Sequence, residues 1–155
     1  DFIFLSSKFY TDYSDCPEIE QKKDRPYIRV CVKINGVLFA VPLRSHIKHR
    51  FALWTDEPNG CGLDFSKSVV LAKPEYIDKN RAPYIRPVEY AVLRGKEHLV
   101  AQRLTQYINT YKKARKRLDV PRNRTIVNTA RYSILRGICN IKQNALRQPP
   151  QSVLS

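Results

Sequence analysis

The chain has little glycine, no long apolar run and no pair of closely spaced cysteines. Only five of its 155 residues are glycine, and none lies in residues 42–49, so this cationic segment is not a nucleotide-binding P-loop. Its longest apolar runs, such as residues 37–41, are far too short to span a bilayer. The N-terminal residues lack the basic region and cleavage site of a signal peptide. We therefore expect a cytoplasmic protein with no membrane segment.

The four cysteines, Cys16, Cys31, Cys61 and Cys139, are too far apart in sequence for a zinc knuckle or a redox pair. Cys31 and Cys139 lie in apolar segments and are expected to be buried thiols. This usage is typical of a reduced cytoplasmic protein. We expect no metal and no cofactor.

Carboxylates are scarce in the second half of the chain. Residues 1–78 contain 11 Lys and Arg against 11 Asp and Glu, whereas residues 79–155 contain 17 against three. The formal charge of +14 therefore lies entirely in the C-terminal half. A polyanionic partner is the natural interpretation, and a generally basic, solvated surface is the alternative.

Short β-strands are indicated in the first half. Residues 27–34 and 37–41 flank Asn35-Gly36, the strongest local signal for a hairpin. Pro42 should end the second strand because proline has no N–H for a ladder. Further strands are expected at 2–7, 51–55 and 65–72, with a loop over 11–24 and a turn over 56–60. The pattern predicts a compact, strongly bent antiparallel sheet or small barrel.

The second half has helical periodicity. Helices are expected over 88–94, after Pro87 in the first turn, and over 96–117, with Gly95 between them and Pro121 ending the segment. A shorter helix is expected over 127–138. We therefore predict one α+β domain, residues 1–147, with basic C-terminal helices and a flexible tail over 148–155.

A cationic segment follows the predicted hairpin. It contains Arg44, Ser45, His46, Lys48 and His49, and no carboxylate. These groups suit metal-free RNA cleavage, in which the 2′-OH attacks phosphorus while a base and an acid transfer protons. The histidines can share the acid–base work, and the cations and the hydroxyl can hold the phosphate oxygens.

Other interpretations of this segment remain open. It can be an exposed basic loop, and a two-histidine metal site lacks a nearby third ligand. A serine hydrolase triad lacks the Gly-x-Ser-x-Gly context. Arg25 is a candidate to reach Ser45, or it forms an ion pair with Asp24.

RNA contacts are expected at a second set of residues. Lys8, Tyr10 and Arg29 combine cationic and aromatic groups near the first strands, although such aromatics also serve in ordinary packing. Seven cations near the end of the long helix oppose Asp119 alone. This basic cluster consists of Lys112, Lys113, Arg115, Lys116, Arg117, Arg122 and Arg124.

The order of short motifs resembles the ToxN/AbiQ toxins of bacterial type III toxin–antitoxin systems, most closely the TenpN branch. The resemblance extends over nearly the whole chain, to about residue 140. Its motifs are Leu5-Ser6-Ser7-Lys8-Phe9-Tyr10, Arg25-Pro26-Tyr27, Asn35-Gly36, Phe39, Pro42-Leu43-Arg44-Ser45-His46-Ile47, Gly62-Leu63-Asp64 and Pro83-Tyr84.

The resemblance implies a Kid/MazF-like sheet with added helices. It implies a metal-independent endoribonuclease that acts on cellular or phage RNA and leaves a 2′,3′-cyclic phosphate. It also implies inhibition by a small repeat antitoxin RNA, a pseudoknot that the toxin processes and with which it forms a closed hetero-oligomer. Such systems often defend against phage by abortive infection.

The family pattern matches the site residues unevenly. Ser45 falls on the serine of the family's Pro-Leu-x-Ser motif, and Arg25 falls near a basic active-site position. Arg44 replaces a Thr or Ser, and His46 replaces a Pro. Family members with Pro-Leu-Thr-Ser carry a lysine two residues after the serine, where this chain has Ile47, followed by Lys48. The resemblance therefore leaves the acid–base assignment open among Arg44, His46, Lys48 and His49.

The remaining functional hypotheses are a non-catalytic RNA-binding module and a DNA-binding regulator that uses the basic helix.

Overall fold

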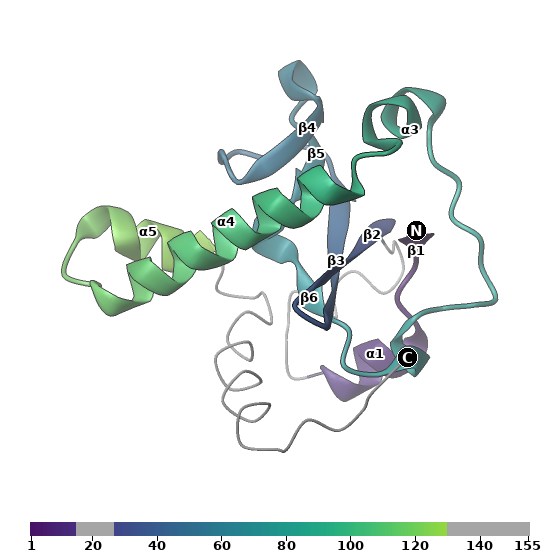
Figure 1. The fold of residues 1–155 in the computed structure, drawn as a ribbon, viewed down its shortest axis with the longest axis horizontal. Coiled ribbons are helices and arrows are strands. Elements are labelled where there is room, and N and C mark those ends of the chain that lie inside the picture. Colours follow the sequence, from purple (N-terminus) through teal and green to yellow (C-terminus); the bar gives the residue numbers. More distant parts are fainter. Residues whose placement is uncertain (15–26, 130–155) are drawn as a thin grey trace.

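A computed structural model describes residues 1–14 and 27–129 and has an α+β architecture (Figure 1). Its antiparallel sheet has the order β1-β2-β3-β5-β4, with β6 paired to β3. Within the described ranges no pairing joins the edge strands β1 and β4. The sheet is therefore open there, and the expected small barrel is not observed. The strands are β1 (Phe2–Ile3), β2 (Arg29–Ile34), β3 (Val37–Arg44), β4 (Ala52–Asp56), β5 (Cys61–Asp64) and β6 (Val69–Val70).

The predicted hairpin is confirmed. Asn35 and Gly36 both have positive φ, 49° and 79°, as a tight β2–β3 turn requires. The prediction that Pro42 ends β3 is wrong, because β3 continues to Arg44. Leu43 N donates to Ile28 O at 2.8 Å, so the nitrogen of Pro42 points away from β2. On that side β6 pairs only as far as Ala40 and β5 begins at Leu43, so no ladder bond is lost.

One face of the sheet packs against α4 (Glu97–Lys116), as Figure 1 shows. Val100, Leu104 and Tyr107 recur at helical spacing and are buried against strand residues such as Val32 and Val41. The helix predicted over 96–117 is therefore confirmed. α3 (Pro87–Leu93) precedes α4, as predicted from Pro87.

The opposite face is covered by a helix that was not predicted. α1 (Ser7–Asp12) forms where a strand end and a loop were expected. Ser6 is its N-cap, with Oγ accepting from Phe9 N at 3.4 Å. Phe9 and Tyr10 pack there against Tyr76 of η3 (Pro74–Tyr76).

The strand predicted over 65–72 is also corrected. The chain forms β5, then η2 (Phe65–Lys67), and only then the two-residue β6. Asp64 causes this break, because its side chain accepts from Ser66 N at 2.9 Å and caps the turn. The turn predicted over 56–60 contains η1 (Glu57–Asn59).

Pro121 begins α5 (Pro121–Thr129), which packs against α4. Proline suits the first helical turn, where its missing N–H has no intrahelical partner. The rest of the helix predicted to 138, the tail over 148–155 and Arg25 lie outside the described residues. In the part of the chain that is described, no helix is both long and apolar enough to cross a membrane.

Candidate functional site

The end of β3 and the start of α3 border a pocket of about 320 Å³. Arg44 and Ser45 line it from the β3 side, and Tyr84, Arg86 and Glu89 line it from the α3 side. Its other walls are Tyr27, Ile28, Leu43, Cys61 and Ile85. Two of the predicted catalytic residues therefore share a pocket with polar and aromatic groups from a distant part of the chain.

The Arg44 side chain is held in place by the buried carboxylate of Asp64. Its Nη1 lies 2.6 Å from Oδ2 of Asp64, whose side chain is fully buried. Burial alone would raise the pKa of Asp64, but hydrogen bonds from His49 and Ser66, together with the charges of His49 and Arg44, hold it below its ordinary value. The guanidinium also lies over the Tyr27 ring, 5.6 Å from its centroid. Arg44 is therefore held in one orientation at the pocket wall.

His49 is part of the same hydrogen-bonded cluster as Asp64. Its Nδ1 accepts from Phe51 N at 3.1 Å, so the neutral ring carries its proton on Nε2. Nε2 lies 3.1 Å from both Oδ1 of Asp64 and Oγ of Ser66, and Ser66 donates to that Oδ1 at 2.6 Å. In a hydrolase triad the acid and the serine contact opposite ring nitrogens, whereas here they share one, and Ser66 is fully buried. This cluster therefore anchors the loop and does not form a nucleophilic triad.

Ser45 and His46 form the exposed part of the site. His46 Nδ1 lies 3.1 Å from Ser45 Oγ, and both residues are solvent-accessible. His46 has a φ of 57°, which is uncommon outside glycine and is found at functional loops. Ile47 N donates to Gly60 O at 3.0 Å, and a Cβ on Gly60 would come within 3.3 Å of His46 Cα. The loop therefore rests directly on the Gly60 backbone.

Both arginines at the pocket are paired with carboxylates. Arg86 Nε lies 2.6 Å from Glu89 Oε1, as Arg44 does from Asp64. The formal charges of these two pairs cancel. An anion in the pocket would therefore be held by the remaining guanidinium N–H groups and by Ser45. Lys48 is exposed three residues after Ser45 and does not line the pocket.

Tyr10 and Arg29 are corrected from surface contacts to interior residues. Each is only 6% exposed. Arg29 Nη1 donates to Lys67 O at 3.2 Å, and its Nε has no hydrogen-bond partner. Burial lowers the pKa of Arg29 to about 10, so it stays charged at neutral pH. The alternation of β2 explains this: Val30 and Val32 face α4, so Arg29 faces the interior of the other side.

Lys8 is not part of the pocket. It is exposed on α1 and lies 3.4 Å from Asp12, an i,i+4 ion pair. α1 packs against η3, away from the strand end that carries Ser45.

The basic cluster forms a separate surface at the C-terminal end of α4 and on α5. Lys113, Arg115 and Lys116 are exposed in the last turn of α4, where cations complement the helix dipole. Lys112 is half-buried. The other members are Arg117, bound to Asp119 at 3.1 Å, Arg124, which donates to Leu118 O at 2.9 Å, and exposed Arg122.

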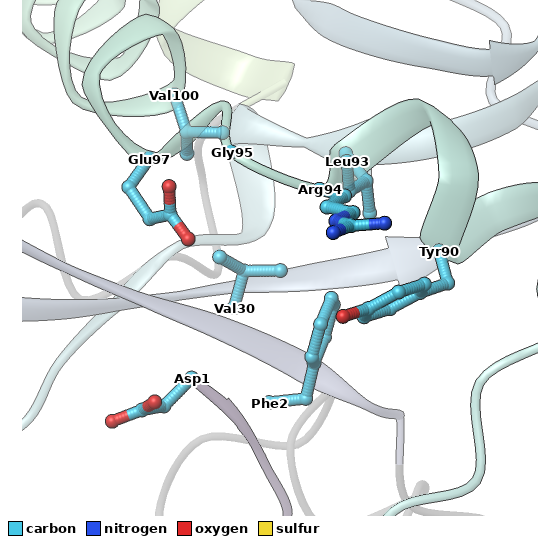
Figure 2. A pocket seen from close by; sticks show the side chains of 9 residues that line it. All are labelled: Asp1, Phe2, Val30, Tyr90, Leu93, Arg94, Gly95, Glu97 and Val100. Carbon is cyan, nitrogen blue, oxygen red and sulfur yellow. The ribbon is translucent and has the colours of Figure 1, made fainter.

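Another pocket, of about 270 Å³, lies where β1 and β2 meet the α3–α4 turn (Figure 2). Arg94 points into it near Tyr90 and Phe2, and Asp1 and Glu97 place two carboxylates at its other end. Its described lining includes none of the predicted site residues. Two carboxylates make it less suited to an anionic ligand than the pocket at Ser45.

Several important residues were missed by sequence reasoning. Asp64 was named only as part of a motif, although a carboxylate at the end of an apolar strand was a usable signal for a buried partner. Tyr84 was likewise named only as part of a motif, and Arg86 and Glu89 gave no local signal, since only the fold brings these residues to Ser45.

A scan of protein-family models, a search of curated proteins and a search of solved structures each found no match to this chain.

Proposed function

We propose that this protein is a metal-independent endoribonuclease of the kind implied by its resemblance to the ToxN/AbiQ toxins. The supporting observation is the pocket in which Arg44 and Ser45 meet Tyr27, Tyr84 and Arg86. Guanidinium and hydroxyl donors suit a phosphodiester, and aromatic rings suit its flanking base. A Kid/MazF-like relationship for the open sheet is part of this proposal.

In the proposed reaction the RNA 2′-OH attacks the adjacent phosphorus and the 5′-oxygen leaves, giving a 2′,3′-cyclic phosphate. Ser45 and the free N–H groups of Arg44 hold the non-bridging oxygens as negative charge develops. His46 and Lys48 are the exposed groups available for proton transfer, because both ring nitrogens of His49 are engaged. We therefore assign proton transfer to His46 and Lys48, and a structural role to His49.

The basic cluster is the proposed binding surface for an inhibitory RNA. Lys113, Arg115 and Lys116 are exposed cations, and the nearest carboxylate in sequence, Asp119, is paired with Arg117, which leaves these three charges for a nucleic-acid backbone. We propose that a small pseudoknot RNA contacts this surface, is processed by the enzyme and forms a closed complex with it.

The test is cleavage by purified protein in EDTA. We expect RNA fragments that end in 2′,3′-cyclic phosphate, a strong loss of cleavage in Ser45→Ala, and unchanged binding of the inhibitory RNA by that variant. A discrete small RNA should co-purify with the wild-type protein. Wild-type protein that gives no cleavage and no cyclic ends contradicts the enzymatic proposal.

A non-catalytic RNA-binding module is the second candidate. It is favoured by the charge balance of the pocket, where Arg44 and Arg86 are each neutralised by a carboxylate. It predicts RNA binding without strand cleavage, and the same experiment distinguishes the two.

A further inference from the structure

Tyr84 is an unusually exposed aromatic residue at the rim of the candidate site. Its relative exposure is 78%, the highest among the large hydrophobic residues of ranges 1–14 and 27–129. It lies in the segment just before α3 and lines the same pocket as Arg44 and Ser45. A tyrosine ring left in water contributes little to folding, and at the edge of a pocket it is available to bind a ligand.

The surroundings of Tyr84 favour a nucleobase as its ligand. Tyr27 lines the same pocket, where the Arg44 guanidinium lies over its ring. Arg86, two residues after Tyr84, is fixed to Glu89 in the first turn of α3. Alternating aromatic and guanidinium groups beside a phosphate-binding hydroxyl are the features of a single-strand binding groove, in which bases stack and donors hold the backbone. A protein-docking surface would not require these cations.

We propose that Tyr84 stacks on the nucleobase next to the phosphate held by Ser45, so that the protein selects RNA that is unpaired at this position. This inference rests on the proposed function, since it places the scissile phosphate at Ser45. A base within a duplex has both faces covered by its neighbours, so it cannot stack on a side chain without first leaving the helix. Tyr84 is thus a specificity-determining residue that acts on substrate structure.

The decisive experiment measures base stacking without requiring cleavage. The probe is a 2′-O-methyl oligoribonucleotide with one 2-aminopurine, which lacks the attacking 2′-OH and reports stacking by fluorescence quenching. We expect the wild-type protein to quench it and Tyr84→Ala to bind about 5- to 30-fold more weakly with little quenching, which is the lower part of the range for one stacked base. Tyr84→Phe keeps the ring and should behave like the wild type. The control is Val88→Ala, which alters a 71% exposed side chain outside the pocket.

A second measurement uses cleavable RNA with an abasic ribonucleotide scanned along it. An abasic site next to the cleaved bond should slow the wild-type enzyme about as much as Tyr84→Ala slows cleavage of intact RNA. The two changes combined should not be additive, because they remove the same contact. A duplex of the same sequence should resist cleavage.

The outcomes separate the two proposals. Equal quenching and affinity for wild type and Tyr84→Ala reject the stacking role, whether or not RNA is cleaved. Quenching that depends on Tyr84, without any cleavage, rejects the nuclease proposal and supports the stacking site. Equal losses in Tyr84→Ala and Val88→Ala also contradict the inference, because they show that the loss does not depend on the aromatic ring in the pocket.

Discussion

Replacing Asp64 with asparagine should remove the electrostatic support of the candidate site. Asp64 is fully buried, and its two oxygens hold Arg44 at 2.6 Å and Ser66 at 2.6 Å, with His49 at 3.1 Å. Asparagine keeps the volume and one acceptor oxygen but loses the charge. It also places an amide N–H₂ where a donor already points. The variant should therefore leave Arg44 charged, half-buried and without its carboxylate.

The size of the effect follows from burial. Removing one partner of a buried ion pair costs about 3–5 kcal/mol. The Arg44 side chain is 24% exposed, and water there can replace part of the lost interaction. We therefore expect a loss of about 2–4 kcal/mol from the free energy of unfolding. Since domains of this size are stable by about 5–15 kcal/mol, Asp64→Asn should still fold at low temperature.

The assay is urea unfolding followed by Trp54 fluorescence. Trp54 is the chain's single tryptophan, and it pairs with Gly62, two residues before Asp64. With a slope of about 2 kcal/mol per molar urea, the midpoint should fall by about 1–2 M. The control is Asp119→Asn, which breaks the exposed Arg117–Asp119 pair and should leave the midpoint unchanged. Equal midpoints for the two variants would refute the supporting role of Asp64.

The same variant should change the acid stability profile. The folded-state pKa of Asp64 lies below its ordinary value of 3.8. Its stabilisation is therefore complete above the unfolded-state pKa and is lost as the pH falls through the lower, folded-state pKa. Between these two values the wild type should lose stability with falling pH more steeply than Asp64→Asn. Parallel profiles for the two proteins would show that this carboxylate is not preferentially ionised in the folded state.

Three further predictions concern the loop and the basic cluster. His46→Gln should slow RNA cleavage by about 100-fold without lowering the urea midpoint, whereas His49→Gln should lower the midpoint; wild-type cleavage by His46→Gln would place proton transfer elsewhere. Gly60→Ala should lower the free energy of unfolding by at least about 1 kcal/mol and slow cleavage, because its Cβ would lie 3.1 Å from Ile47 N. Gly36→Ala is the control for backbone strain alone, because Gly36 has a similar φ and nothing lies within 4 Å of its Cβ position. Neutralising the three exposed lysines and arginines of the last α4 turn should lower the salt dependence of RNA binding by about one unit per residue, and Lys33→Gln should leave it unchanged; an unaltered slope would locate the RNA surface elsewhere. The residues of the triple variant are Lys113, Arg115 and Lys116.

The parts of the fold that were predicted correctly depend on local signals. Asn35-Gly36 specifies its turn through backbone conformation alone, and the apolar spacing of α4 is visible within 20 residues. The errors arose where a side chain redirected the backbone. Ser6 caps α1 in a segment that otherwise reads as a strand end, and Asp64 caps η2 where the strand predicted over 65–72 would begin. Such capping bonds compete with strand pairing, and composition does not show which one wins.

The candidate site was predictable only in its contiguous part. Arg44, Ser45 and His46 stand together in the sequence, so their proximity needed no fold. The orientation of His49 depends on its contacts with Asp64 and Ser66. The pocket is completed by Tyr84 and Arg86, which lie some 40 residues beyond Ser45 in the sequence. Contacts over such separations are set by tertiary packing, and spacing within one sequence does not specify them.

The length of α4 sets the distance that a stacked RNA strand must cover to contact both ends of this helix. α3 leads into the start of α4, and the exposed cations lie in its last turn, 20 residues and about 30 Å away (Figure 1). At about 3.4 Å per stacked nucleotide, a strand needs roughly nine nucleotides to cover that span. Shorter oligomers contact one end alone, whereas longer ones gain an intramolecular second contact at high effective concentration. The affinity for RNA should therefore rise sharply near nine nucleotides, and the protein would bind intact RNA more tightly than short fragments.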